Sequence, residues 1–268
     1  MQEKCCICVI LCNFVAMLVK TEAIVLHSLK YGESRLIVDM FCRELGRVSF
    51  VVSLAKSAKS PLKKQYFQPM TLLEVECDVR QRVQLQKLKD IRLLSTYASV
   101  PFSPEKLALS LFVAEFLYHA LRAEQQNEPL FAFVCDAMQW LDTVEAGFAN
   151  FHLTFLMRLS RFLGFYPNLE VRGLKSGVKG MSDSGYFFDL REGCFSTLAP
   201  THRDFLQPAD AQRIHLLMRM DFPTMHLYRL SRHDRNRILG VLLHYYRLHL
   251  PQFPELKSVS VLQELWAE

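Results

Sequence analysis

The chain has 268 residues, 50% of them hydrophobic, which is enough to bury a substantial core in two or three domains. This composition is typical of a soluble globular protein, and no wholly apolar run of about 20 residues is present to span a bilayer. The formal net charge is +5 at pH 7, and the excess of Lys and Arg lies within residues 17–100. A basic segment beside a nearly charge-balanced one favours a polyanion-binding module joined to a structural or partner-binding one.

The eight cysteines do not indicate a disulfide scaffold, because four crowd the first 12 residues and the others lie singly in apolar or strand-like runs. We expect reduced thiols in a cytosolic protein. The first 16 residues resemble a weak signal peptide or a metal-binding cluster, yet Asn13 interrupts the apolar run and the cysteines lack a paired CxxC spacing or a His partner. We therefore expect residues 1–16 to be a leader or upstream extension outside the fold, with the functional chain beginning at Met17.

Apolar and polar residues alternate in the segments that follow, with the period of two that is typical of half-buried strands. The alternation is clearest in residues 47–55 and 70–80, and no helical pattern separates the first three segments. The sequence therefore predicts a five-stranded OB-fold β-barrel over residues 17–98. Its strands are expected at 19–28, 35–42, 47–55, about 70–80 and 83 to about 93.

A lysine-rich loop follows the third predicted strand, with small residues and one proline between its lysines. Loop lysines are often only a solubilising surface, but the charge excess of this third of the chain favours contact with a phosphate backbone. Aromatic side chains near the strand ends would add base stacking, which tolerates any base sequence. The predicted nucleic-acid-binding residues are Arg35, Arg47, Lys56, Lys59, Lys63, Lys64, Tyr31 and Tyr66.

Beyond residue 98 the hydrophobic period changes to three and four, which predicts a mainly helical domain over residues 99–268. Ser103 and Pro104 form a helix start, because serine caps the first turn and proline fits the first helical position. Five glycines between about residues 167 and 200 predict a small irregular β-containing insert. The fold class is thus α+β multidomain. Further helices are expected at about 129–145, 148–163, 208–220, 234–248 and near 260.

The sequence holds no Walker phosphate loop and no GxGxxG, GxSxG or HExxH motif. His244 and His249 lie five residues apart in a predicted helix and so on different faces, which disfavours a metal site. The phenylalanines of the helical segments recur at core spacing. We therefore expect a protein that is not an enzyme and has no cofactor; a metal-dependent hydrolase would lack its ligands.

Short motifs along the chain resemble the RecO family of bacterial DNA repair proteins. In the predicted barrel these motifs are Leu18 to Leu26, Tyr31-Gly32-Glu33-Ser34, Gly46-Arg47-Val48, the Lys56–Lys64 loop and Gln68-Pro69. In the helical part they are Phe155 to Leu159, Leu163-Gly164-Phe165, Tyr246 to Leu250 and Leu256-Lys257-Ser258. The resemblance covers the chain from Met17 to its end.

The resemblance implies a barrel that binds single- and double-stranded DNA, followed by a helical domain. It implies a role in recombinational DNA repair, in which the protein anneals complementary strands and, with RecR, helps to load RecA onto DNA coated with single-strand-binding protein. It also implies a cytoplasmic, nucleoid-associated protein without a membrane partner. The alternative is a non-enzymatic adaptor that joins repair proteins and touches DNA only incidentally.

The insert departs from the family pattern. Many relatives carry a four-cysteine zinc knuckle there, whose pairs would fall near Arg172 and Lys175 and near Thr197 and Pro200. Only Cys194 remains in this chain, and one thiolate cannot hold a tetrahedral zinc ion. We therefore expect a degenerate knuckle that binds no metal.

The resemblance also implies that the helical domain binds the acidic C-terminal tail of single-strand-binding protein. Arginine beside an apolar groove suits an acidic peptide with a hydrophobic end. Relatives often have Arg before and Glu after the phenylalanine of the central helix, where this chain has Thr154 and Leu156, so the family pocket is not carried over. The predicted peptide-binding residues are Arg158, Arg161, Arg229, Arg232, Arg235 and Arg237.

Overall fold

The computed structural model describes residues 17–53, 64–80, 83–173 and 185–264. They form two compact units that divide after Met138, and each unit is described by itself. The boundary predicted at residue 98 lies inside the first unit, because helix α2 (Pro104–Ala120) packs on strand β1 (Met17–Tyr31). Within the described residues, no helix is both long enough and apolar enough to cross a membrane.

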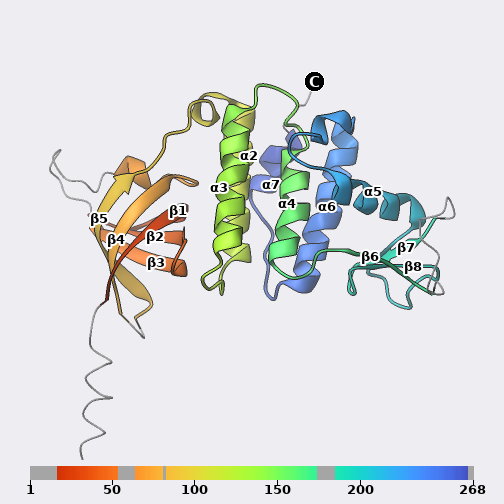
Figure 1. Cartoon of the computed structure of the whole chain (residues 1–268), viewed down its shortest axis with the longest axis horizontal. Helices are drawn as coiled ribbons and strands as arrows, with labels where there is room; N and C mark the ends of the chain where they lie inside the picture. The colour runs from red at the N-terminus through yellow and green to blue at the C-terminus, as the bar shows by residue number, and fades with distance from the viewer. Residues whose placement is uncertain (1–16, 54–63, 81–82, 174–184, 265–268) are drawn as a thin grey trace, which may run out of the picture. The chain divides into compact units, whose positions relative to one another are not determined.

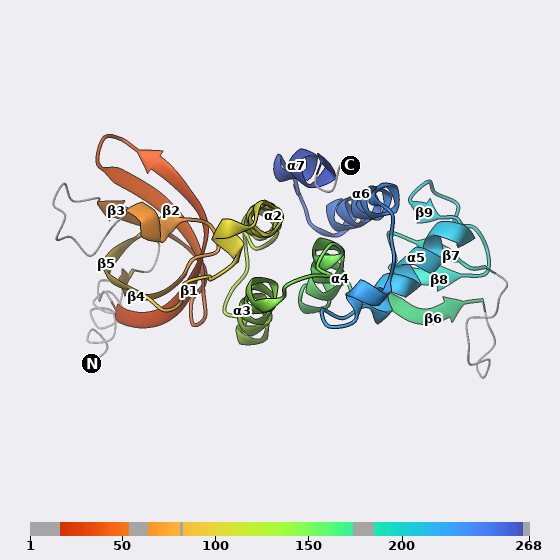
Figure 2. The same ribbon diagram turned by 90° about the horizontal axis from the view of Figure 1, so that it is seen from above.

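The first unit contains a five-stranded barrel, whose strands can be followed in Figures 1 and 2. The strand order β1-β2-β3-β5-β4 closes on itself through the pairing of β1 with β4. All strand pairs of the barrel are antiparallel except β3–β5, which is parallel. This pair has three residue pairs, the fewest of any two neighbouring strands in the barrel. The predicted OB-fold type of barrel is thereby confirmed. After β1 its strands are β2 (Arg35–Cys42), β3 (Gly46–Ser53), β4 (Leu72–Val79) and β5 (Leu85–Leu93).

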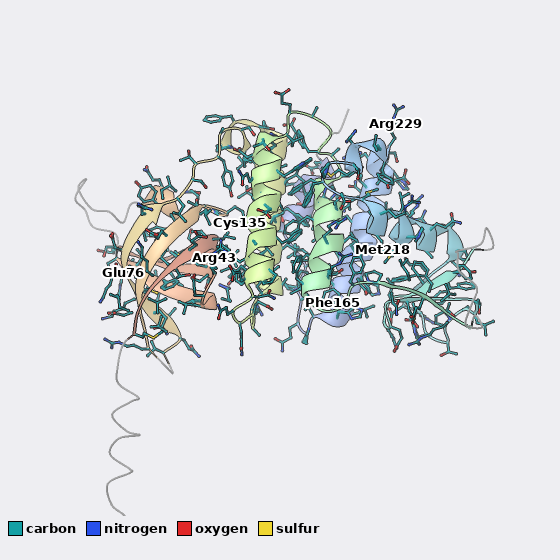
Figure 3. The ribbon with its side chains drawn as sticks, in the orientation of Figure 1. Arg43, Glu76, Cys135, Phe165, Met218 and Arg229 are labelled. Carbon is teal, nitrogen blue, oxygen red and sulfur yellow. The ribbon has the colours of Figure 1, made fainter. Side chains whose placement is uncertain are left out.

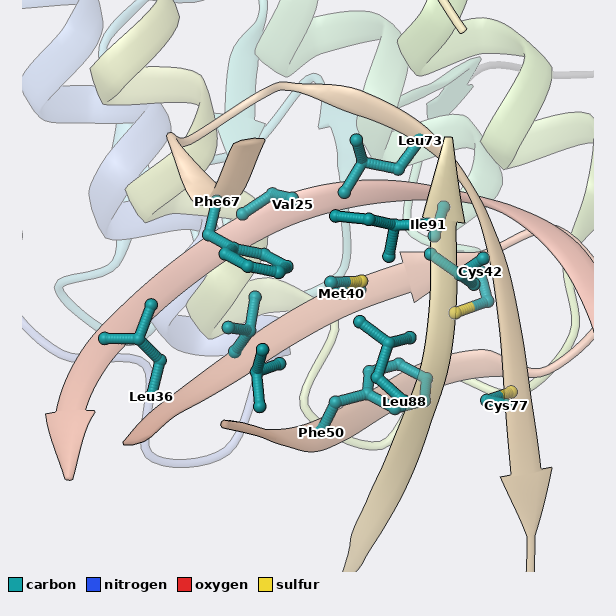
Figure 4. Packing of buried hydrophobic residues seen from close by; sticks show 14 residues of the cluster. Val25, Leu36, Met40, Cys42, Phe50, Phe67, Leu73, Cys77, Leu88 and Ile91 are labelled. Atoms are coloured by element: carbon teal, nitrogen blue, oxygen red, sulfur yellow. The ribbon is translucent and has the colours of Figure 1, made fainter. Parts of the chain in front are cut away.

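The alternating residues decide which side of each strand enters the core. In β4, Leu73, Val75 and Cys77 are fully buried and the residues between them are partly exposed, as predicted. Phe50 of β3 and Phe67 of the short 3-10 helix η1 (Lys64–Phe67) fill the same core (Figure 4). Each such burial stabilises the fold by roughly 1.5–3 kcal/mol, so this cluster is the main source of barrel stability.

The hairpin between β2 and β3 packs closely on the connection that follows α2. Gly46 has a φ of +70°, and a Cβ at this position would lie 2.4 Å from the carbonyl carbon of Gln125, so only glycine fits. The Arg47 N–H donates to the Glu124 carbonyl at 2.9 Å. The hairpin is therefore fixed against the helical part of the same unit.

The helices of the first unit start where the sequence predicts. The Ser103 hydroxyl accepts from the Lys106 N–H, and Pro104 is the first residue of α2, so the predicted cap is confirmed. A 3-10 helix, η2 (Val100–Phe102), precedes it, and α3 (Glu128–Thr143) follows.

In the second unit, α4 (Phe151–Phe162) packs against α5 (Pro208–Arg219) and α6 (Arg232–His249). Tyr246 of α6 is completely buried, and its hydroxyl donates to the Leu156 carbonyl at 2.7 Å. This bond satisfies the one polar atom of the side chain inside the core. The remaining helices are η3 (Met225–Leu227) and α7 (Ser258–Glu264).

The predicted insert contains a four-stranded sheet of order β6-β8-β7-β9. Its strands are β6 (Asn168–Arg172), β7 (Phe187–Asp189), β8 (Cys194–Ser196) and β9 (Phe205–Leu206). The sheet runs on beyond residue 200, where the insert was expected to end, because β9 pairs with β7. Phe188 and Phe195 are fully buried and contact each other with ring centroids 4.9 Å apart, which gives the sheet an apolar side.

His152 of α4 makes the second unit sensitive to acid. Its side chain is 2% exposed, and burial, with the nearby charge of Arg235, lowers its pKa to about 3. An unfolded histidine titrates near pH 6.5, so between these values the unfolded chain binds more protons and the free energy of unfolding falls as the pH falls. From pH 7 to pH 5 we expect this residue alone to cost about 2 kcal/mol, measured by urea unfolding.

His152→Met is the matched variant, since it places an apolar side chain of similar volume in the buried site and removes the titrating group. Its loss of stability between pH 7 and pH 5 should be smaller than that of the wild type by the same amount. An equal loss in both proteins would show that His152 is not held neutral.

Candidate nucleic-acid interface

The strand register of the barrel brings one aromatic and several basic and apolar side chains onto a common outer side. Tyr31 of β1 lies opposite Arg35 of β2, which lies opposite Ser53 of β3. Neighbours directly across a sheet share a face. One step further along the strands, the register aligns Leu29, Ile37, Val51 and Lys87 of β1, β2, β3 and β5. We call these seven residues the barrel face.

The barrel face is open to solvent and carries positive charge. Tyr31 is 47% exposed and Leu29 is 55% exposed, so two large side chains of this face meet solvent. The Arg35 guanidinium lies over the Tyr31 ring, 5.3 Å from its centroid. Arg35 and Lys87 are exposed, and neither forms an ion pair with another residue in the described part of the chain. An exposed aromatic ring beside one unneutralised cation on β2, with a second exposed cation on β5 of the same face, suits the chemistry of a base and nearby phosphates.

At its other end, the same outer side of β1, β2 and β3 is covered by α2. The rings of His27 and Tyr118 lie 4.6 Å apart, and the Arg47 guanidinium lies 4.9 Å from the Tyr118 centroid. Arg47 forms an ion pair with Asp39 at 3.1 Å, and both side chains are 10% exposed. Helix α2 thus buries the Arg47–Asp39 pair, whereas Arg35 and Lys87 of the barrel face remain exposed to water.

Electrostatics hold this buried pair charged. Burial by itself would raise the pKa of Asp39, but hydrogen bonds with His27 and Ser49 and the charge of Arg47 outweigh it and hold this pKa below its usual range. Burial lowers the pKa of Arg47, and Asp39 and Tyr118 oppose that effect. The Arg47 guanidinium therefore interacts with Asp39 and Tyr118 within the first unit.

Arg35 and Arg47, both predicted to contact nucleic acid, are not brought together. Arg35 is the first residue of β2, whereas Arg47 of β3 lies opposite Phe41, near the other end of β2. Six residues of strand separate these positions, about 20 Å. Arg35 belongs to the barrel face, and Arg47 lies under α2.

The lysine-rich loop lies largely outside the described residues. Lys56, Lys59 and Lys63 fall in residues 54–63, which directly follow Ser53 of the barrel face in the chain. Lys64 begins η1 and is exposed. Tyr66 is half-buried against the barrel core, which makes it a weaker stacking candidate than Tyr31.

The outer side of β4 has the opposite electrostatic character. It presents Glu74, Glu76 and Asp78, and Glu76, labelled in Figure 3, lies directly across from Asp90 of β5. Three of the cations nearby are already paired: Lys20 and Arg92 contact Glu74 at 3.0 and 3.4 Å, and Lys89 contacts Asp78 at 2.8 Å. Lys87, directly across from Asp78, marks the border between this side and the barrel face. A polyanion is therefore repelled from this side of the barrel.

Only Tyr31 and Arg35 of the barrel face were among the predicted binding residues, and reasoning from the sequence missed Leu29, Ile37, Val51, Ser53 and Lys87. The first strand was expected to end at Ser28, which left Leu29 outside it. Lys87 joins the face only through the parallel pairing of β3 with β5, a contact between segments far apart in the sequence. The alternation within β5, where Gln86 and Leu88 are buried, was the available signal that Lys87 points outward.

Arg158, Arg235 and Arg237, which were predicted to bind a peptide, are engaged within the second unit. Arg158 donates to the Met220 carbonyl at 3.0 Å and forms an ion pair with Asp221. Arg235 donates to a backbone carbonyl at 2.7 Å. Arg237 forms an ion pair at 2.6 Å with a carboxylate of α5.

The other three arginines of this set are exposed. Arg161 lies over the Tyr166 ring, 4.4 Å from its centroid, and Arg232 donates to the Gln263 carbonyl at 2.8 Å. Arg229 precedes α6 in the chain (Figure 3). The six residues therefore do not form one cluster of free cations.

Comparison with known proteins agrees with this architecture. The model for the Recombination protein O N terminal matches residues 17–97, and the model for the Recombination protein O C terminal matches residues 101–258. The DNA repair protein RecO of Phocaeicola vulgatus is 47% identical over 251 residues, which cover 94% of this chain and the full length of that protein. The proteins of the same name from Bacteroides fragilis and Porphyromonas gingivalis are 46% and 34% identical over 93% of the chain and their full length. The chain therefore belongs to the RecO family of DNA repair proteins.

Proposed function

We propose that this protein is a non-enzymatic mediator of DNA repair and homologous recombination that binds single- and double-stranded DNA through the barrel face. The observation that carries the proposal is the exposed Tyr31–Arg35 pair with Lys87 on the same face, set against an acidic side around β4. The names of the relatives support a role in DNA repair.

The barrel face offers two kinds of contact to a DNA strand. A base can stack on the exposed ring of Tyr31, which contributes roughly 1–3 kcal/mol per base and is tolerant of sequence. Arg35, Lys87 and Lys64 can neutralise phosphates, and we include Lys56, Lys59 and Lys63 because they follow the face in the chain. We leave Arg47 out of the interface, since its guanidinium is paired with Asp39.

In the cell we propose that the bound strands are annealed to their complements. We further propose that, with RecR, the protein helps RecA to load onto DNA coated with single-strand-binding protein, as a cytoplasmic, nucleoid-associated factor. Strand annealing requires a surface that holds phosphates without reading base edges, because the incoming strand must keep its pairing edges free. Stacking and phosphate contacts meet that requirement.

An annealing assay tests this function. The full-length protein should speed the annealing of complementary oligonucleotides over the spontaneous rate, and Arg35→Glu combined with Tyr31→Ala should reduce this acceleration about tenfold or more, because a phosphate contact and a stacking platform are lost together. Arg122→Glu, an equal charge change at an exposed residue after α2, is the control.

If the variant with Arg35→Glu and Tyr31→Ala accelerates annealing as much as the wild type does, the assignment of the barrel face is contradicted. No acceleration by the wild type, with RecR still bound, would favour the alternative of an adaptor with incidental DNA contact.

For the second unit we propose binding of the acidic tail of single-strand-binding protein through its exposed arginines. Because Arg158, Arg235 and Arg237 are engaged internally, the charge-reversing variants of choice are Arg161→Glu and Arg229→Glu. Together they should weaken the binding of a tail peptide by about tenfold at low salt, as measured by fluorescence anisotropy, and less at high salt. Arg35→Glu is the control, and a loss of peptide binding in that variant instead would place the peptide on the barrel.

A further inference from the structure

The insert sheet closes without the ligands of a zinc knuckle. The resemblance places two of the cysteine positions near Arg172 and Thr197, and the structure joins these residues directly. The Thr197 N–H donates to the Arg172 carbonyl at 3.2 Å, and its hydroxyl lies 3.4 Å from the same oxygen. A Cβ at Gly173 would lie 2.4 Å from the Thr197 Oγ1, so the space between these positions is already filled. The side chains present there do not fit a zinc ion.

One carboxylate fixes the turn between β7 and β8. Asp189 is 7% exposed, and its Oδ1 accepts from the backbone N–H groups of Arg191 and Glu192 at 2.9 and 3.1 Å. Its Oδ2 lies 3.2 Å from the Nε2 of His202, in the segment that leads to β9. Asp189 thus joins the turn between β7 and β8 to the segment between β8 and β9.

A second carboxylate ties the same segments to helix α6. The Oδ2 of Asp204 lies 2.6 and 2.7 Å from two guanidinium nitrogens of Arg191, and its Oδ1 lies 3.0 Å from the Nε2 of His244. These contacts hold the pKa of Asp204 below its usual range. Arg191 is shared, because its backbone binds Asp189 and its side chain binds Asp204.

We propose that this group of five residues, Asp189, Arg191, His202, Asp204 and His244, is a polar clasp that holds the insert in place of a metal site. A structural zinc ion joins four side chains from two chain segments. The clasp joins three segments, residues 189–192, residues 202–204 and α6, through two carboxylates that each accept three hydrogen bonds or ionic contacts. The insert therefore keeps its sheet in the metal-free protein, and Asp204 strengthens its attachment to α6, to which His249 also contributes through a contact of 2.9 Å with the Leu190 carbonyl.

Hydrogen exchange of the full-length protein tests the clasp. In Asp204→Asn and Asp189→Ala, backbone amides within residues 187–206 should exchange about tenfold faster than in the wild type, because the local opening of the insert becomes easier, while amides of α4 stay protected. Glu170→Gln, at an exposed residue of β6, is the matched control and should exchange like the wild type. Treating the wild type with EDTA should change nothing.

Three results would overturn the proposal. One is that the amides of residues 187–206 exchange in Asp204→Asn at the same rate as in the wild type. Another is that these amides of the wild type exchange faster after EDTA treatment. The third is one zinc ion per chain by elemental analysis of protein purified without added metal. Should Asp189→Ala unfold the whole unit, His244→Leu decides, since leucine removes the contact between α6 and Asp204 and offers no hydrogen bond in its place. Unchanged protection in that variant would refute the clasp.

Discussion

Replacing Arg47 by alanine should lower the free energy of unfolding by about 3 kcal/mol and leave DNA binding by the folded protein almost unchanged. The guanidinium is 10% exposed, is paired with Asp39 at 3.1 Å and lies over the Tyr118 ring. Its removal leaves the Asp39 carboxylate buried without its main counter-charge and takes a contact away from α2. Urea unfolding at pH 7 measures the first effect, and oligonucleotide binding well below the unfolding midpoint measures the second.

The pH dependence of this loss has a defined sign. In the wild type the pKa of Asp39 is lowered, so its contribution is present above the carboxylate's unfolded pKa and is lost as the pH falls through the lower folded value. The difference between wild type and Arg47→Ala should therefore shrink below about pH 4, where Asp39 takes up a proton in the variant. Tenfold weaker DNA binding without loss of stability would mean that Arg47 does reach the DNA.

Reversing three lysines at the end of the loop, Lys59→Glu, Lys63→Glu and Lys64→Glu, should weaken the binding of every oligonucleotide by roughly 100-fold or more at low salt. Each substitution removes a proposed phosphate partner and adds a repulsive charge in the segment that follows the barrel face in the chain. The loss should be equal for different base sequences, because we propose that these residues contact phosphates and not base edges.

The matched control reverses three exposed arginines of the second unit, Arg203, Arg219 and Arg247, which changes the net charge by the same amount. This control should keep most of the affinity. If both triple variants lose affinity to the same extent, the binding depends on overall charge and not on the barrel.

Local patterns in the sequence were sufficient to predict the elements of the barrel. The alternation of buried and exposed residues in β4 and the turns at Gly32 and Gly46, both with positive φ, are decided by residues close together in the chain. β1 is longer than predicted, because its first residues pair with β4 and its last with β2. Pairing across such separations leaves little trace in a local pattern.

The same limit explains what the sequence left open at the candidate site. Arg35 and Arg47 look equivalent on their strands, and Tyr118, about 70 residues further on, covers one end of that outer side and leaves the other open. Lys87 reaches the barrel face only when β5 closes the barrel on β3. In the insert the sequence predicted an irregular β-containing segment, and the buried Phe188 and Phe195 organise its strands into a sheet.

The salt dependence of oligonucleotide binding is the most direct test of the barrel face as a DNA-binding surface. For single-stranded DNA the logarithm of the binding constant should fall linearly with the logarithm of the salt concentration, with a slope of about −0.7 for each phosphate contact. With several cations in contact, the wild type should show a slope of about −2 to −4, and Arg35→Gln with Lys87→Gln should make it shallower by about 1.4. A wild-type slope near zero, or the same steep slope in the double variant, would contradict the assignment of DNA binding to this face.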